Sequence, residues 1–218
     1  TGFEFKKPNY AINANVYYMN YKDQLVLTGK INDVGAYTRT NVPKSYRAGL
    51  ELQVKYAFNK KYNTSYSITF SQNKIEEFTE YIDDYDQFTQ VAIQHKNTNI
   101  ALSPSLITNR TFNWKPNDKL SFFWTTKYTS KQFLDNTQNK DRQLDAFFIN
   151  DLNAHWTILN KTKFTMLLQL YANNVLDVKY APNGYTFSYI YDRSLITSNN
   201  FYPMAGRNYW ISLKIDIK

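Results

Sequence analysis

The chain has 218 residues, which in a soluble protein would suit one large domain or two small ones. Its 26 Lys and Arg residues exceed its 18 Asp and Glu residues, so the net charge is a mild +8. There is no Cys and there are only two His residues, which excludes a disulfide scaffold, a thiolate metal site and a cysteine nucleophile. A multi-histidine metal centre would need carboxylates or a second copy of the chain to complete it.

Hydropathy and aromatic content favour a β-rich chain. The mean hydropathy is −0.58, and no stretch approaches the run of about 18 apolar residues that a membrane helix needs. A low mean is also typical of outer-membrane β-barrels, because their strands are apolar on one face only. Aromatic residues make up 17% of the chain, while Gly and Pro number six each. Aromatic side chains suit half-buried sheet surfaces, and Tyr and Trp suit a boundary between hydrocarbon and water.

Alternation with period two predicts nine strands. The clearest runs from residue 46 to 58, where even positions such as Leu50, Leu52 and Val54 are apolar and odd positions such as Glu51 and Gln53 are polar. Such a strand has one apolar face and one wet face over about two soluble-strand lengths. In chain order the predicted strands lie at residues 3–5, 10–18, 46–58, 64–70, 112–114, 120–128, 152–156, 164–170 and 209–217.

The connections between these strands are predicted to be short at one end of the sheet and long at the other. Short polar turns are expected at residues 6–9, 59–63, 115–119 and 159–162, and long polar loops at 21–45, 75–99, 130–143 and 174–206. Aromatic side chains gather where strands meet the short turns, at Tyr56, Phe58, Phe112, Trp114 and Trp156. Periplasmic turns, extracellular loops and an aromatic girdle are typical of outer-membrane barrels. The predicted fold is therefore all-β, an antiparallel transmembrane β-barrel.

Nine is an odd number of strands, whereas bacterial single-chain barrels have an even number. We therefore expect the nine strands to be part of a larger barrel. The first residues show neither the basic nor the apolar region of a signal peptide. An outer-membrane protein must be exported, so we expect its signal to have been removed by processing or omitted from this sequence.

Six stretches together resemble the C-terminal barrel region of TonB-dependent outer-membrane receptors. The most specific is NVPKSYRAGLEL at residues 41–52, which resembles the family's strand start with Asn, Ser, Gly and Glu at fixed spacing. The others, in family order, are YYMNYKDQLV at 17–26, LSPS at 102–105, KYTSKQFLDNT at 127–137, NNVLDVKY at 173–180 and YPMAGRNY at 202–209. The resemblance covers nearly the whole chain.

The resemblance implies that residues 1–218 are the C-terminal part of a 22-stranded barrel in the bacterial outer membrane. The implied function is the import of a scarce nutrient such as an iron chelate, cobalamin or a glycan. The implied partners are membrane lipid, an N-terminal plug and the remaining strands, which lie outside this sequence together with the TonB box, and TonB itself. The barrel-assembly machinery is expected to read the terminal strand through Tyr209, Ile211, Leu213, Ile215 and Ile217.

Candidate ligand residues lie in the acidic loop at residues 76–86 and just beyond it. Its carboxylates would suit Ca²⁺, but they lack the spacing of a calcium loop, and a solvated loop tip is the favoured interpretation. The aromatics Tyr81, Tyr85 and Phe88 are better candidates for contact with a ligand. Inward positions are expected to line the lumen or contact the plug, and they include Asn13, Asn15, Arg47, Glu51, Gln53, Lys55, Lys127 and Gln169.

No catalytic residue, metal ligand or cofactor is predicted, because no nucleophile motif is present. Nucleic-acid binding is not expected either, since the lysines are spread over turns and inward positions rather than gathered on one face. The alternative is a complete small β-barrel or a soluble β-sandwich with a structural, adhesion or binding role. A complete barrel predicts pairing between its first and last strands.

Two polar residues, Arg110 and Asn150, fall on the outward register of the predicted strands. An Arg on the lipid face near the bilayer midplane costs about 2–4 kcal/mol. A β-bulge that shifts the register after Pro104 would remove this cost, and we expect one there.

Overall fold

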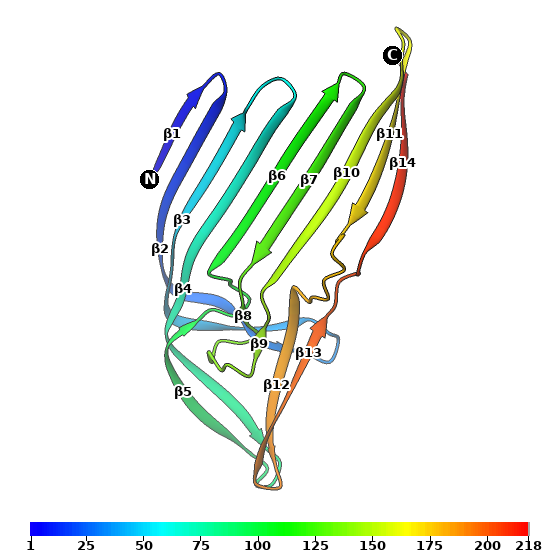
Figure 1. Cartoon of the computed structure of the whole chain (residues 1–218). Coiled ribbons are helices and arrows are strands. Elements are labelled where there is room, and N and C mark those ends of the chain that lie inside the picture. Colours follow the sequence, from blue (N-terminus) through cyan, green and yellow to red (C-terminus); the bar gives the residue numbers. More distant parts are fainter. Residues whose placement is uncertain (218) are drawn as a thin grey trace.

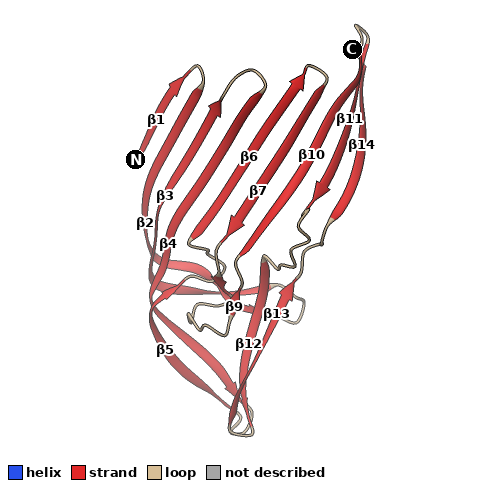
Figure 2. Cartoon of the chain, in the orientation of Figure 1, coloured by secondary structure: helices blue, strands red, loops and turns tan. Residues whose placement is uncertain are grey.

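A computed structural model describes residues 1–217, which form an all-β fold (Figure 2). These residues contain no helix long and apolar enough to cross a membrane. In chain order the strands are β1 (Gly2–Lys7), β2 (Tyr10–Ile31), β3 (Tyr37–Ala57), β4 (Tyr62–Asp84), β5 (Thr89–Asn99), β6 (Leu106–Asn117), β7 (Leu120–Thr129), β8 (Gln132–Phe133), β9 (Gln143–Leu144), β10 (Phe147–Asn160), β11 (Phe164–Asn173), β12 (Asn183–Tyr191), β13 (Ser194–Tyr202) and β14 (Asn208–Ile217).

Nine strands form one continuous antiparallel sheet in the order β1-β2-β3-β4-β6-β7-β10-β11-β14. The predicted nine strands and the all-β antiparallel class are therefore confirmed. Figure 1 shows β1 and β14 at opposite edges of this sheet. Within residues 1–217 they do not pair with each other, which contradicts the alternative of a complete small barrel.

The register keeps apolar and polar side chains on opposite faces. Leu52 lies opposite both Ala14 and Ile68 on the apolar face, while Asn13 lies opposite Gln53 on the polar face. A slip of one residue would exchange the two faces, so the apolar face fixes the register of each strand.

The predicted short turns lie together at one end of the sheet (Figure 1). Aromatic side chains pack across the strands near this end, where Trp114 stacks with Tyr62 at 6.4 Å and with Phe122 at 5.2 Å between ring centroids. Cross-strand aromatic pairs stabilise a sheet, and amphipathic rings suit a membrane boundary. The arrangement is that of an interfacial girdle.

The connections at the other end are not the irregular loops that the sequence suggested. β2 and β3 pair as far as Ile31 and Tyr37, β4 pairs with β5 up to Asp84, and β12 pairs with β13. We call residues 22–44, 75–99 and 183–202 the outer hairpins. Strand pairing satisfies the backbone donors and acceptors of these polar segments without an apolar core. Their polar composition therefore did not predict that these segments form strands.

The expected register shift after Pro104 is wrong. β4 and β6 pair without interruption from Phe70 opposite Leu106 to Tyr62 opposite Trp114. Arg110 therefore stays on the apolar face, and its guanidinium lies over the rings of Phe112 at 6.0 Å and Trp124 at 5.8 Å. The aromatic faces lower the cost of the charge, so no bulge is needed.

Asn150 also stays on the apolar face, opposite Thr126, but only 4% of it is exposed. Trp124 Nε1 donates a hydrogen bond of 2.9 Å to Asn150 Oδ1. The indole therefore shields the amide from the surroundings and supplies one of its hydrogen bonds.

The cost of Arg110 gives a testable expectation. Arg110→Leu in the full-length protein should raise the free energy of unfolding by about 1–3 kcal/mol, because lipid-face arginine is costly and the ring contacts recover only part of that cost. Urea unfolding in lipid vesicles measures the change. Arg47→Leu is the matched control on the polar face, where Arg47 donates to Asn73 at 3.0 Å, and it should be destabilising. Equal effects of the two variants would contradict the assignment of faces.

Candidate functional site

The segment between β7 and β10, residues 130–144, lies among the outer hairpins, and we call it the connecting segment. Asn136, which is fully buried, donates from Nδ2 to the backbone oxygen of Leu27 at 2.6 Å. Its Oδ1 accepts from the backbone nitrogen of Ala101 at 2.8 Å. A single side chain therefore joins β2 to the turn before β6.

An apolar cluster lies where the outer hairpins leave the sheet. Its members are all buried and come from β2, β3, β4 and the residue after β5: Val26, Val42, Ile75, Phe78 and Ile100. Burial of apolar area is the main stabilising contribution to such a junction. Two of the outer hairpins, residues 22–44 and 75–99, are therefore packed against each other at their base.

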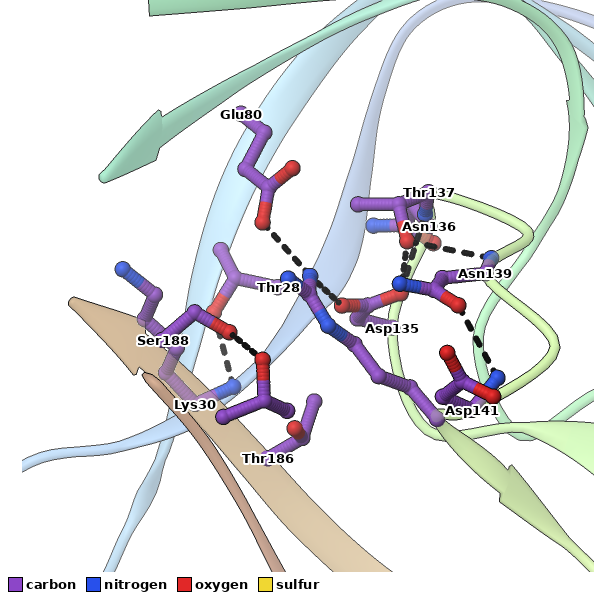
Figure 3. A network of polar contacts seen from close by, with 12 residues as sticks. Thr28, Lys30, Glu80, Asp135, Asn136, Thr137, Asn139, Asp141, Thr186 and Ser188 are labelled. Carbon is purple, nitrogen blue, oxygen red and sulfur yellow. Dashed lines mark hydrogen bonds and ion pairs between the residues drawn. The ribbon is translucent and has the colours of Figure 1, made fainter. Parts of the chain in front are cut away.

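Three charged side chains meet between β4 and the connecting segment (Figure 3). Arg142 Nη1 lies 2.5 Å from Glu80 Oε1 and 2.8 Å from Asp135 Oδ2, and only 3% of Arg142 is exposed. Glu80 Oε2 lies 3.0 Å from His95 Nε2 on β5. We call Arg142, Glu80 and Asp135 the ion cluster. Charge-assisted hydrogen bonds of this length are the strong ones, and here they join β4 to the connecting segment.

The ion cluster keeps Arg142 charged. Burial lowers the pKa of the guanidinium, but hydrogen bonds to Asp135 and Glu80 and the charges of both carboxylates outweigh burial and raise the pKa above its usual value. The cation is therefore present at every physiological pH.

A cavity of about 200 Å³ borders the ion cluster. It is lined by residues of β2, β3, β4, β12 and the connecting segment, among them Thr28, Lys30, Thr38, Tyr81, Arg142 and Ser188. Five segments of the chain therefore share one polar cavity at the loop end of the sheet.

A larger groove of about 550 Å³ lies elsewhere, across β6, β7, β10, β11 and β14. Its lining is mostly aromatic and aliphatic side chains of the apolar face, such as Phe112, Trp124 and Leu170. In a barrel wall that face is turned toward lipid, so the smaller polar cavity is the candidate site.

The three predicted ligand aromatics lie in different settings. Tyr81 lines the polar cavity, and its backbone oxygen accepts from Lys30 Nζ at 3.0 Å. Tyr85 packs edge-on against Tyr189 of β12 at 5.6 Å. Phe88, at the turn between β4 and β5, is 91% exposed. The structure brings only Tyr81 to the cavity.

The predicted lumen residues share the polar face of the sheet, where several bond to one another or to neighbours. Asn15 Nδ2 donates to Glu51 Oε2 at 3.2 Å, and Gln169 lies 3.3 Å from His155. The strand register places the other predicted lumen residues on the same face. Asn13 lies opposite Gln53, Lys55 opposite Ala11, and Lys127 opposite Asn109. Arg47 is held by Asn73 and Ser103.

The sequence did not single out Lys30, Asp135 or Arg142 as site residues. Two sequence features could have drawn attention to this site: Asp135 belongs to the family-like stretch at 127–137, and Glu80 belongs to the acidic loop. Arg142 lies in a polar run with no periodicity. Among residues 1–217, no three His, Asp or Glu side chains are arranged to hold a metal ion.

Two family-like stretches, 173–180 and 202–209, contact each other at the loop between β11 and β12. Asp177 Oδ1 accepts from the backbone nitrogen of Arg207 at 2.8 Å and from Lys179 Nζ at 3.1 Å. A Cβ on Gly206 would lie 2.5 Å from the same oxygen, so a larger residue there would displace the Asp177 carboxylate. These contacts, first the Arg207 amide and then Lys179, lower the pKa of Asp177 below its usual 3.8.

The lowered pKa predicts the pH response of this loop. A depressed carboxyl pKa stabilises the folded loop above the usual value, and this contribution is lost as pH falls through the folded-state pKa. Hydrogen exchange of residues 174–182 and 204–208 in the full-length protein should therefore show the loop opening only below about pH 3.8. Asp177→Asn should exchange faster at neutral pH and lose this acid-dependent step. An unchanged acid step in the variant would assign the opening to another group.

The last strand of the sheet, β14, presents the residues proposed for barrel assembly on one face. Tyr209, Ile211 and Leu213 lie opposite Ala172, Leu170 and Leu168 of β11. Ile215 and Ile217 continue the alternation, and all five residues are exposed. Lys218 lies outside the described residues.

Solved structures with a similar fold include two receptors and a copper transporter. The siderophore receptor PiuA from Acinetobacter baumannii has a TM-score of 0.64 and 16% identity over 99% of this chain. The ferric yersiniabactin uptake receptor FyuA from Yersinia pestis has a TM-score of 0.63 and 16% identity over 96%. The copper transporter OprC has a TM-score of 0.66 and 17% identity over 99%. The chain covers 27%, 28% and 31% of these three structures respectively.

A comparison with curated protein sequences finds no match. A family model, described as TonB dependent receptor-like, beta-barrel, matches residues 1–175. Proteins of this family are transporters of the outer membrane of Gram-negative bacteria rather than enzymes, and a plug domain and interaction with TonB are general features of the family. The fold and the family match agree, and the chain belongs to the TonB-dependent receptor β-barrel family.

Proposed function

We propose that this chain supplies barrel wall and extracellular hairpins to a TonB-dependent receptor that imports a scarce nutrient. The observation that carries the proposal is the nine-strand antiparallel sheet with short turns at one end and interlocked outer hairpins at the other. An open sheet has two unpaired edges, so transport requires the remaining strands. Residues 1–218 would then be the C-terminal part of the receptor barrel.

An iron chelate is the favoured substrate class among iron chelates, cobalamin and glycans. Support comes from similar structures that are described as a siderophore receptor and a ferric yersiniabactin uptake receptor. Substrate would be captured at the outer hairpins, with Tyr81, Tyr85 and Phe88 as contact residues. Phe88 is 91% exposed at a hairpin tip, which favours an early encounter with the substrate. Tyr81 lies beside the polar cavity, which favours contact with the substrate at a later stage.

The polar face of the sheet is proposed to contact the plug. It carries charged and amide side chains such as Glu51, Lys55 and Lys127, which suit a hydrated lumen. The alternation along β14, from Tyr209 to Ile217, is proposed as the signal for the barrel-assembly machinery, and outer-membrane lipid would cover the apolar face.

Two measurements test this function. Mass spectrometry of the native product in isolated outer membranes should give a mass several times 25.8 kDa, because plug and further strands are required. A mass near 25.8 kDa would contradict the transporter proposal. Uptake of radiolabelled ferric chelates should then fall to background when either the gene or TonB is deleted, and uptake that persists without TonB would also contradict it.

A further inference from the structure

The net charge of the chain lies almost entirely at the turn end of the sheet. The four short turns, with the strand ends beside them, contain one acid, Asp118, and eight lysines that we call the turn lysines: Lys6, Lys7, Lys60, Lys61, Lys115, Lys119, Lys161 and Lys163. Their combined charge is therefore +7, out of +8 for the whole chain. The outer hairpins at the other end carry nine acids and six Lys or Arg residues. Figure 1 shows the four turns along the same edge, so the charge is concentrated there.

The charge of the turn lysines is not neutralised within the described part of the chain. Lys115 is half-buried, with its Nζ 3.5 Å from Asp118 Oδ1. The other seven are exposed and make no side-chain hydrogen bond or ion pair with residues 1–217. Like charges gathered at one edge repel one another. A partner that supplies negative charge along this edge would remove the repulsion.

Aromatic rings place the turn lysines at the boundary of the membrane. Lys7 Nζ lies over the rings of Phe5 and Tyr10, at 5.7 Å and 6.0 Å from their centroids. Lys61 directly precedes Tyr62, which belongs to the interfacial girdle. A strand rises about 3.3 Å per residue, so Lys61 begins one step beyond a girdle ring. Girdle rings lie at the level of lipid headgroups, and a long Lys side chain extends its ammonium toward them.

The turn lysines follow the rim of the sheet rather than one compact patch. They come from the ends of eight neighbouring strands, from β1 to β11 along the sheet. At about 4.8 Å between neighbouring strands, these eight strands form an arc of about 34 Å. Lipid headgroups surround a barrel along its whole rim, so they can meet every turn in such an arc. The arrangement therefore favours lipid over a protein domain as the negatively charged partner.

We propose that the turn lysines bind the phosphate groups of anionic phospholipids, such as phosphatidylglycerol, in the membrane leaflet at the turn end. The proposal rests on the proposed function in one respect: the sheet must span a bilayer with its short turns at the periplasmic surface. Lysines near an anionic membrane surface are attracted to it, and one lysine gives about a fivefold preference. The partner is thus a class of lipid, selected by charge.

The test uses the complete receptor in phosphatidylcholine vesicles with increasing fractions of phosphatidylglycerol. Brominated lipid quenches Trp fluorescence on contact, and Trp114, directly before Lys115, is 39% exposed. Quenching by brominated phosphatidylglycerol relative to brominated phosphatidylcholine measures the preference. We expect the parent to prefer phosphatidylglycerol about fivefold, and this preference to fall as salt is raised.

A triple variant of the two turns next to Trp114 tests the lysines directly: Lys60→Gln, Lys61→Gln and Lys119→Gln. Its preference for phosphatidylglycerol should fall below about twofold. The matched control removes the same charge from exposed positions near the outer hairpins: Lys96→Gln, Lys131→Gln and Lys140→Gln. It should keep the preference of the parent. Thermal unfolding in pure phosphatidylcholine should be the same for both variants, because none of the six side chains bonds to residues 1–217.

Three results would overturn the proposal. They are no preference for phosphatidylglycerol in the parent, equal preferences in the two triple variants, and a preference that salt does not change. Soluble polyglutamate is the probe for the other class of partner. If it bound the parent but not the turn variant, with no lipid preference, the turns would be assigned to an acidic protein instead.

Failure of this proposal is distinguishable from failure of the proposed function. TonB-dependent uptake of a ferric chelate by a receptor with no preference for phosphatidylglycerol would overturn the lipid site alone. A preference that depends on Lys60, Lys61 and Lys119, in a receptor whose deletion leaves uptake unchanged, would keep the lipid site and overturn the transport function.

Discussion

Replacing Arg142 with Met is expected to destabilise the outer hairpins by about 3–5 kcal/mol. The substitution removes the cation that lies 2.5 Å from Glu80 and 2.8 Å from Asp135, while both carboxylates stay buried. Breaking a buried ion pair from one side is costly because the remaining charge is left without compensation. The effect should persist at high salt, since buried pairs are screened much less than exposed ones.

Hydrogen–deuterium exchange of residues 76–84 and 130–144 in the complete receptor measures this loss. The expected result is faster exchange in both segments, because Arg142 joins β4 to the connecting segment. Arg39→Met is the matched control, since Arg39 is exposed on β3 and has no side-chain hydrogen bond or ion pair within residues 1–217. A loss below about 1 kcal/mol relative to this control would mean that water compensates the two carboxylates.

The sheet was predictable from sequence because its determinants are local. Period-two runs such as residues 46–58 specify both the strand and its face, and short turns fix which strands are neighbours. The faces of Asn13, Glu51 and Gln53 could be assigned for the same reason. The misjudged register near Arg110 shows the limit of this reasoning, because an Arg shielded by Phe112 and Trp124 costs less than an isolated one.

The polar cavity was not predictable because its determinants are distant in sequence. Glu80 and Arg142 are 62 residues apart, and Asn136 bonds to Leu27 across 109 residues. No periodicity links such positions, and a polar residue buried by tertiary contacts has the same sequence appearance as one in a solvated loop. The charge of the acidic loop suggested a solvated tip, whereas Glu80 in its centre is 9% exposed and paired.

The second large effect is expected at Gly29, in the irregular part of β2 between Leu27 and Ile31. Its φ of +89° is one that L side chains rarely adopt, and a Cβ there would lie 2.6 Å from both the Leu134 oxygen and the Asp135 Cβ. Gly29→Ala therefore adds backbone strain and a clash with the backbone of the connecting segment. We expect a loss of about 2–5 kcal/mol.

Gly35→Ala separates the two contributions. Gly35 has a similar φ of +80°, but a Cβ there would meet nothing within 4 Å, so it should show the strain alone, about 1–2 kcal/mol. Thermal unfolding of the complete receptor compares the two variants. Equal losses would mean that the connecting segment yields freely to a methyl group and does not pack tightly on β2.

The same pair of variants links packing to the site. Gly29 touches Asp135, and Asp135 holds Arg142 at the cavity, so displacement of the connecting segment should also move the guanidinium. Gly29→Ala should therefore speed hydrogen exchange of residues 130–144 along with the loss of stability, whereas Gly35→Ala should leave that exchange unchanged. If Gly29→Ala destabilised the receptor but left hydrogen exchange of residues 130–144 unchanged, Arg142 would not depend on the close approach of β2 and the connecting segment for its position.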